Sequence, residues 1–204
     1  QKGLLPDPRL IFNGEDRFSL HALVEPARTV GGDFYDCFMI DARRMFFIVG
    51  DVSGKGLPAS LFMAVAKSVI KSTVLHGVEG VGAVLTQANA HLARDNPEFM
   101  FVTAFAGVLD AETGDLEYCN AGHEPAIALR PGALPERLAA PGGPALAAAD
   151  EFDFQAHRRQ LAPGECLCVV SDGVTEALNP QGDFYGHARL MQALGRMGCD
   201  ASDV

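Results

Sequence analysis

The sequence lacks the features of a membrane-spanning or secreted chain. Its 204 residues contain no uninterrupted apolar run of about 18 or more, the length that a bilayer-crossing helix needs. The first residues, Gln1-Lys2-Gly3-Leu4-Leu5-Pro6, lack the basic and then apolar order of a secretory signal. We therefore expect a cytoplasmic domain that makes no direct membrane contact of its own.

Paired cysteines are also missing. Five cysteines form an odd set without C-x-x-C spacing: Cys37, Cys119, Cys166, Cys168 and Cys199. This pattern excludes a disulfide framework and a cysteine-based zinc site. We expect these residues to be small buried thiols.

Positive charge is scarce, with 16 Lys and Arg against 26 Asp and Glu, for a formal net charge of −10. A surface that binds nucleic acid needs clustered Lys and Arg to replace phosphate counterions, so a nucleic-acid partner is excluded. No Cys-x5-Arg phosphatase loop is present either. An acidic protein attracts an anionic ester only where bound cations intervene, which directs attention to carboxylates that could hold metal.

Apolar patterns predict a sheet that is at least partly antiparallel. Alternation over residues 18–24 indicates a strand, and the runs 45–49 and 166–170 indicate buried strands that each end near an aspartate. Residues 101–109 and 116–119 flank the polar turn Asp110-Ala111-Glu112-Thr113-Gly114-Asp115, which is typical of a hairpin.

Three helices are predicted, over residues 57–75, 80–95 and 187–197. In the first, Leu61, Val65 and Val69 form the apolar repeat, and Lys67 and Lys71 occupy the opposite face. The second carries an apolar stripe of Val81, Val84, Leu85, Ala88 and Leu92. The segment 130–150, rich in proline and glycine, is predicted to be a loop. With 48% hydrophobic residues, the chain fits one domain of sheets covered by helices.

Three aspartates are the candidate metal ligands. Asp33 follows Gly31-Gly32, Asp51 follows a predicted strand, and Asp172 follows another. Mg²⁺ and Mn²⁺ prefer a few carboxylates and several waters, and neighbouring glycines let a backbone carbonyl approach a ligand. A lone Asp-Gly pair is more often a surface turn, so the prediction depends on the fold bringing the three together.

Two nucleotide motifs are rejected. Gly31-Gly32-Asp33-Phe34-Tyr35 has Phe34 where the hairpin of cyclic-dinucleotide synthases has a second acidic residue. The loop from Gly50 to Gly56 is one residue too short for a phosphate-binding loop and has Gly56 in place of Ser or Thr.

Together, the order and spacing of the motifs resemble the SpoIIE/RsbU-type branch of the metal-dependent (PPM), protein phosphatase 2C-like superfamily. The resemblance rests on these stretches: residues 4–6, 26–27, 30–36, 50–59, 100–103, Asn120-Ala121-Gly122-His123 with Pro125, 171–177 and 184–186. It covers almost the whole chain.

The resemblance implies an α+β fold, an α-β-β-α sandwich of two mainly antiparallel sheets flanked by helices. It implies two divalent cations, Mn²⁺ or Mg²⁺, whose bound water hydrolyses a serine or threonine phosphate. By the same resemblance, Asp51 bridges both cations, the Val52 carbonyl binds one, and Asp33 and Asp172 complete the second. Asn120 and His123 lie near them and orient loops or substrate; from the residues alone, both side chains equally fit local capping of the backbone.

The chain departs from this family at two places. Ser53 stands where eukaryotic relatives have a histidine thought to protonate the leaving oxygen, so the general acid is left unassigned. No Asp-Asp-x-Thr motif follows Asp172, since Asp183, Asp200 and Asp203 lie in other contexts. The expectation is therefore a single catalytic domain over 1–204 that lacks the family's last helix and strand and binds one metal weakly or not at all.

The implied substrate is a phosphorylated anti-anti-sigma protein of the STAS type in a partner-switching pathway. A sensor or receiver domain is expected upstream of residue 1, and it could tether the full-length protein to a membrane or form a homodimer through the N-terminal region. Two alternatives stay open: a catalytically silent domain that binds its partner without hydrolysis, and a phosphoesterase acting on small molecules.

Overall fold

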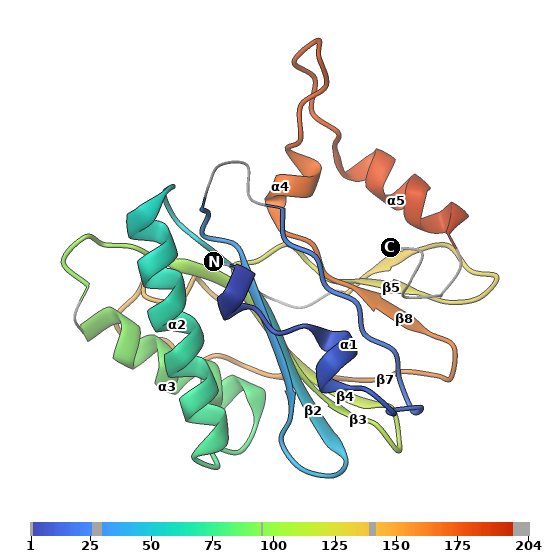
Figure 1. Ribbon diagram of the computed structural model, residues 1–204, viewed down its shortest axis with the longest axis horizontal. Helices are drawn as coiled ribbons and strands as arrows, with labels where there is room; N and C mark the ends of the chain where they lie inside the picture. Colours follow the sequence, from blue (N-terminus) through green and yellow to red (C-terminus); the bar gives the residue numbers. More distant parts are fainter. Residues whose placement is uncertain (1, 26–29, 95, 139–141, 198–204) are drawn as a thin grey trace.

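The computed structural model describes residues 2–25, 30–94, 96–138 and 142–197 and has two antiparallel sheets with helices on their outer faces (Figure 1). Five strands in the order β1-β2-β3-β4-β7 form the larger sheet: β1 (Phe34–Met39), β2 (Arg44–Val52), β3 (Val102–Asp110), β4 (Asp115–Ala121) and β7 (His157–Gln160). The smaller sheet has the order β6-β5-β8: β6 (Glu136–Arg137), β5 (Ile127–Leu129) and β8 (Cys166–Cys168).

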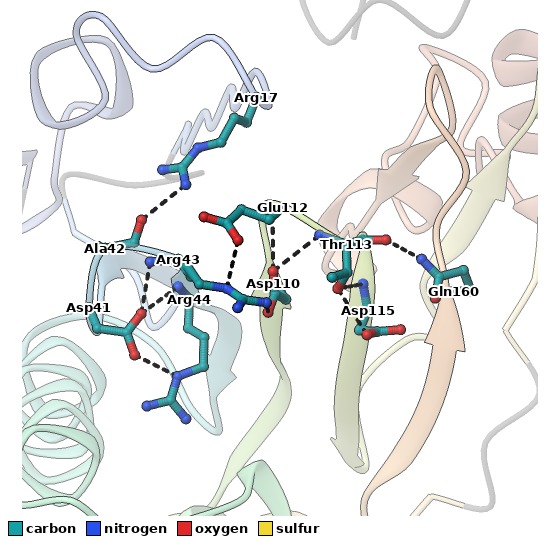
Figure 2. Close-up of polar contacts among 10 residues, drawn as sticks. All are labelled: Arg17, Asp41, Ala42, Arg43, Arg44, Asp110, Glu112, Thr113, Asp115 and Gln160. Atoms are coloured by element: carbon teal, nitrogen blue, oxygen red, sulfur yellow. Dashed lines mark hydrogen bonds and ion pairs between the residues drawn. The ribbon is translucent and has the colours of Figure 1, made fainter.

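The predicted hairpin is confirmed, because β3 and β4 pair in antiparallel register around the turn 111–114. Polar contacts hold this turn and the neighbouring β1–β2 turn (Figure 2). The Arg43 guanidinium donates to Asp110 at 2.6 Å, and the Gln160 amide donates to the Thr113 carbonyl. Both turns lie at the end of the sheet remote from Asp51, since Arg44 pairs with Asp110 and Asp51 pairs with Thr103.

Two long helices, α2 (Leu57–Leu75) and α3 (Val81–Arg94), cover the outer face of the larger sheet (Figure 1). The helix predicted over 57–75 has those bounds, and the one predicted over 80–95 begins one residue later than expected. The predicted stripe of α3 is confirmed, because all five of its residues are buried. They pack with Phe34, Phe46 and Ile48 from the sheet into the main core.

The predicted orientation of α2 is wrong. Leu61 and Val65 are 60% and 52% exposed, and the buried face consists of Ala59, Met63, Ala66, Ile70, Thr73 and Val74. The reason is electrostatic: Lys67 lies 2.9 Å and Lys71 3.5 Å from the carboxylate of Asp36, a β1 residue that is only 2% exposed. A buried carboxylate needs a charged partner, and the two lysines supply it from the face assigned to solvent.

The smaller sheet packs on the larger one and carries α5 (His187–Arg196) on its other side (Figure 1). Phe105, Leu116 and Tyr118 of the larger sheet meet Ala126, Ala128 and Leu138 between the sheets. Leu190 and Leu194 of α5 pack on Ile127, Leu129 and Cys168. The α-β-β-α arrangement predicted from the family resemblance is therefore confirmed.

Two predicted strands need correction. Residues 18–24 alternate between half-buried and exposed positions, yet they pair with no other strand in the described part of the chain. An apolar residue at every second position indicates that one side of an extended segment is buried. It does not show that another strand is hydrogen-bonded to that segment. The strand predicted over 166–170 stops at Cys168.

The predicted loop over 130–150 is also more structured than expected, as far as its described residues show. It contains the short strand β6, and isolated bridges join Val102 to Leu146 and Ala121 to Gly143. Residues 26–27, Cys199, Asp200 and Asp203, which entered the sequence predictions, lie outside the described residues.

The length and composition of α2 would suffice to cross a membrane. This is weak evidence, because a core helix meets the same criterion, and α2 has six residues in the domain interior. Cys37, Cys119 and Cys168 are buried thiols, as predicted, whereas Cys166 is only half-buried. Burial raises the pKa values of the three buried thiols to about 12, 11 and 11.

Candidate metal and catalytic site

Asp33, Asp51 and Asp172 come from three separate parts of the chain and meet at one end of the larger sheet. Asp33 directly precedes β1, and Asp51 is the penultimate residue of β2. Asp172 begins the short helix α4 (Asp172–Thr175), which follows β8 of the other sheet. The fold thus brings Asp51 and Asp172 together although they are 121 positions apart in the sequence.

The electrostatics of the three carboxylates show their mutual proximity. Burial raises the pKa of Asp51 to about 7, and the negative charges of Asp33 and Asp172 add to this shift. The pKa of Asp33 is also raised, mainly by burial, although a hydrogen bond from the Ser171 side chain acts in the opposite direction. A group of carboxylates that destabilise one another's charged forms is a functional-site signature.

Gly32 allows the backbone before β1 to lie directly against the end of β2. A Cβ at this position would lie 2.5 Å from the Val52 carbonyl oxygen, closer than real side-chain atoms approach backbone. The sequence indicated only that glycines beside the three aspartates let the backbone approach a ligand closely. The structure assigns Gly32 a specific role: it lets Asp33 approach the carbonyl that the family resemblance makes a metal ligand.

Replacing Gly32 with alanine is therefore expected to move the Val52 carbonyl or the Asp33 loop. Overpacking of this kind costs about 1–3 kcal/mol of stability, and we expect a roughly tenfold weaker Mn²⁺ affinity as well. Urea unfolding and calorimetric Mn²⁺ titration measure the two effects. Gly173→Ala is the matched control, since its added Cβ meets nothing nearer than the Ser171 hydroxyl at 3.6 Å. Equal Mn²⁺ affinity in both variants would contradict the prediction.

Asn120 and His123 form a tightly bonded turn at the end of β4. The Asn120 amide donates to the His123 carbonyl at 2.9 Å and accepts from the His123 amide N–H at 2.7 Å. Both side chains are buried, at 6% and 7% exposure. Asn120 thus caps the local backbone, and its predicted contact with substrate stays a prediction.

The His123 ring contacts β3 of the larger sheet. Its Nδ1 atom lies 2.9 Å from the Thr103 hydroxyl. Burial lowers the pKa of His123 to about 4, while the Asp172 charge and the Val170 backbone act in the opposite direction. Thr103 was visible in the sequence only as the end of a family motif, because nothing local indicates that its side chain meets a histidine twenty residues later.

Ser53, which stands where eukaryotic relatives have a histidine, forms two hydrogen bonds with the backbone of Phe101. Its N–H donates to the Phe101 carbonyl and its Oγ accepts from the Phe101 N–H, each at 2.9 Å. These bonds continue the β2–β3 pairing by one residue. Ser53 therefore extends the pairing of β2 and β3, and the general acid stays unassigned.

The donor set suits a hard divalent cation. Carboxylate oxygens and the Val52 carbonyl are the ligand types that Mg²⁺ and Mn²⁺ prefer, and a bound cation would relieve the repulsion that raises the pKa of Asp51. Within the described residues, however, no three His, Cys, Asp or Glu side chains are already gathered tightly enough to hold a metal.

Comparison with known proteins agrees with this geometry. The family model described as Stage II sporulation protein E (SpoIIE) matches residues 41–203. Protein IcfG of Synechocystis sp. is 33% identical over 87% of this chain and 32% of its own length. The phosphoserine phosphatase RsbU of Bacillus subtilis is 27% identical over 92% of this chain and 55% of its own length. The chain therefore spans about a third to just over half of these relatives.

Among solved structures, the SiaA PP2C domain of Pseudomonas aeruginosa superposes with a TM-score of 0.81 at 23% identity, covering 98% of this chain and 79% of that one. This likeness establishes the fold, including both sheets and their covering helices. With the family model matching most of the sequence, the chain belongs to the SpoIIE family, and its fold is that of a PP2C-like phosphatase domain.

Proposed function

We propose that this domain hydrolyses a phosphoserine or phosphothreonine on a regulatory protein with the help of two divalent cations, Mn²⁺ or Mg²⁺. The observation that carries the proposal is the convergence of Asp33, Asp51 and Asp172, in which the first and third raise the pKa of the second. Three neighbouring carboxylates repel one another without a cation, and a bound cation would remove that repulsion. The name of the relative RsbU, a phosphoserine phosphatase, supports the choice of substrate class.

The residues divide the work as follows. The carboxylates of Asp33, Asp51 and Asp172 would hold the cations, with Asp51 shared between them as the family resemblance implies, and Val52 would offer its carbonyl. When bound, the cations would supply an acidified water and offset the negative charge of the phosphoryl group. No side-chain nucleophile is required. Ser171 orients Asp33 through its hydrogen bond, and Asn120 orients the turn that carries His123.

A phosphorylated anti-anti-sigma protein of the STAS type is the proposed partner. The support is similarity to RsbU, since the residues of the site by themselves select only a phosphomonoester. The overall charge of −10 disfavours the approach of an anionic phosphate group unless cations lie at the point of contact. The proposed metal centre meets that requirement.

The test compares substrates with one preparation of the chain. Phosphate release from a phosphoserine-containing STAS protein, from p-nitrophenyl phosphate and from phosphorylated metabolites is measured with Mn²⁺, with Mg²⁺ and with EDTA. We expect cation-dependent release with the phosphoprotein as the preferred substrate. A preference for metabolites would identify a small-molecule phosphoesterase instead.

A catalytically silent binding domain is the second candidate, favoured by one observation: no three donors in the described residues are gathered tightly enough for a metal. In that case the chain would bind the phosphorylated partner and release no phosphate under any cation. Binding of the phosphorylated partner in a calorimetric titration, without phosphate release from the same sample, would establish a silent binding domain. Turnover that disappears with EDTA would exclude it.

A further inference from the structure

Phe101 lies on the same face of the larger sheet as Asp51, closer to the end of the sheet. In the β2–β3 register Asp51 is opposite Thr103, and the Ser53 N–H donates to the Phe101 carbonyl at 2.9 Å, which continues the pairing. Successive side chains of a strand alternate between the two faces, so Thr103 and Phe101 share the face of Phe105, which is buried between the sheets. Asp51 is on that face too, because directly opposite residues of an antiparallel pair point to the same side.

The spacing of Asp51 and Phe101 matches the spacing of residues in a bound peptide. Diagonal neighbours on one face of an antiparallel pair are about 7–8 Å apart, which is within reach of an aromatic side chain. An extended peptide rises about 3.3 Å per residue, so residues two positions apart have nearly the same separation. The N–H and the carbonyl of Phe101 are both bonded to Ser53, which fixes its backbone relative to Asp51. A phosphoserine at Asp51 would therefore bring its flanking residues to Phe101.

Phe99 is a second aromatic residue in the same segment, and its conformation is strained. Its side chain is 87% exposed, and its φ of +50° lies in the left-handed region that favours glycine. The surrounding turn is well bonded: the Asn96 amide donates to the Met100 carbonyl at 2.6 Å and accepts from the Met100 N–H at 2.9 Å. Neither packing nor backbone preference accounts for a phenylalanine at position 99. An exposed residue kept in a strained conformation beside a candidate site indicates a function for its side chain.

The charges near Phe101 determine which flanking residues fit. The chain carries a net charge of −10, the three candidate metal ligands are carboxylates, and Glu98 is exposed in the same segment as Phe99 and Phe101. An acidic residue beside the phosphoserine would be repelled by these groups. An apolar residue would instead cover part of the Phe101 ring, which is 41% exposed.

We propose that Phe99 and Phe101 form an aromatic platform that contacts the residues on either side of the phosphoserine in the substrate protein. The aromatic platform selects apolar flanking residues over acidic ones. The inference rests on the proposed function, because the platform meets these residues only when the phosphoserine reaches Asp51. A small phosphoester has no flanking residues, so the same platform favours phosphoproteins over metabolites.

The test uses three phosphoserine peptides that differ only in the two residues beside the phosphoserine, which are leucine, glycine or aspartate. Phosphate release with Mn²⁺ gives kcat and KM for the parent chain, Phe101→Ala, Phe101→Arg, Phe99→Gly and the control Leu134→Ala. Phe99→Gly removes the ring without strain, since glycine adopts a positive φ freely. Leu134 is also 87% exposed, and it follows β5 at the end of the smaller sheet where β8 begins, whereas Asp172 follows the other end of β8.

We expect the parent chain to have a kcat/KM for the leucine peptide about 10-fold above that for the glycine peptide, mainly through KM, and the aspartate peptide to be the poorest substrate. Phe101→Ala should lose most of the leucine preference and keep the kcat/KM of the glycine peptide within about threefold. Phe101→Arg should prefer the aspartate peptide, a gain that misfolding cannot produce. Phe99→Gly should lower the leucine preference about two- to threefold and unfold at the same or a higher urea concentration than the parent.

Equal leucine preference in Phe101→Ala and Leu134→Ala would overturn the inference, as would a parent chain that prefers the aspartate peptide. If Phe101→Ala and Phe99→Gly sediment as smaller species than the parent and keep its peptide preference, the two rings join copies of this chain instead.

Failure of the proposed function has a different result, because the parent chain would then release no phosphate from any of the three peptides. Calorimetric binding of the leucine and glycine peptides to the parent and to Phe101→Ala would decide the role of the aromatic platform in that case. Tighter binding of the leucine peptide that Phe101→Ala abolishes would support the platform, and equal binding of both peptides to the parent would contradict it.

Discussion

Asp51→Asn is expected to lower cation-dependent phosphate release by about 10³-fold or more, which corresponds to about 4 kcal/mol of transition-state stabilisation. The charges of both Asp33 and Asp172 act on Asp51, and the family resemblance makes it the ligand shared by the two proposed cations, so we expect its loss to affect both. The measurement is the rate of release from p-nitrophenyl phosphate under saturating Mn²⁺. Asp115→Asn makes the same chemical change at the opposite end of the larger sheet, where Asp115 accepts a hydrogen bond from Thr113 (Figure 2). Similar rates of phosphate release for the two variants would show that Asp51 has no specific role in the reaction.

The same substitution is expected to stabilise the metal-free domain at high pH. The folded-state pKa of Asp51, about 7, lies above the ordinary value of 3.8, so the folded state binds its proton more tightly than the unfolded state does. The associated stability is fully present below pH 3.8 and is lost as the pH rises through about 7. Asparagine carries no charge, so we expect a gain of about 1–2 kcal/mol at pH 8, reduced from the full shift because the side chain is partly exposed.

Thermal unfolding in EDTA at pH 5 and pH 8 measures this gain. The advantage of Asp51→Asn over the parent should be larger at pH 8, and added Mn²⁺ should raise the melting temperature of the parent only. A variant that is less stable than the parent at pH 8 would mean that the Asp51 charge is already compensated without metal. Asp51→Asn would thus lower activity and raise the stability of the metal-free domain, which is the pattern expected for a residue that serves function at a cost in stability.

Asp36→Ala is expected to cost about 3 kcal/mol of unfolding free energy, near the lower end for breaking a buried ion pair. Asp36 is 2% exposed, and its loss leaves Lys67, whose side chain is 14% exposed, without its partner at 2.9 Å. Lys71 is 41% exposed and can return to solvent, which limits the cost. Urea unfolding of the metal-free chain measures the change.

Lys67→Met supplies the comparison, because Lys71 remains near Asp36 and the expected cost falls to about 1–2 kcal/mol. The double variant Asp36→Leu with Lys67→Met should be more stable than Asp36→Ala, since no buried charge is left alone. If Asp36→Ala unfolds at the urea concentration of the parent, the contact does not hold α2 against β1.

Much of the domain could be predicted from the sequence because its signals are local. The bounds of α2, the stripe of α3 and the β3–β4 hairpin follow from periodicity, a proline at the first helical turn and a polar turn, all read within about twenty residues. The candidate ligands were visible for the same reason: each aspartate stands beside a glycine or at the end of an apolar run. Their order along the chain also indicated the family.

What only the tertiary structure decided depends on contacts between distant segments. Periodicity predicted the helix α2 but the wrong inward face, because the sequence does not show that Lys67 and Lys71 meet the buried carboxylate of Asp36 on β1. The alternation over 18–24 indicated an extended segment, yet whether a strand lies beside it is a property of the whole fold. The meeting of Asp33, Asp51 and Asp172, and the Thr103–His123 contact behind them, likewise required both sheets to be in place. Hydrophobic periodicity is a property of neighbouring residues in the sequence, whereas the neutralisation of a buried charge depends on which distant residues the fold places beside it.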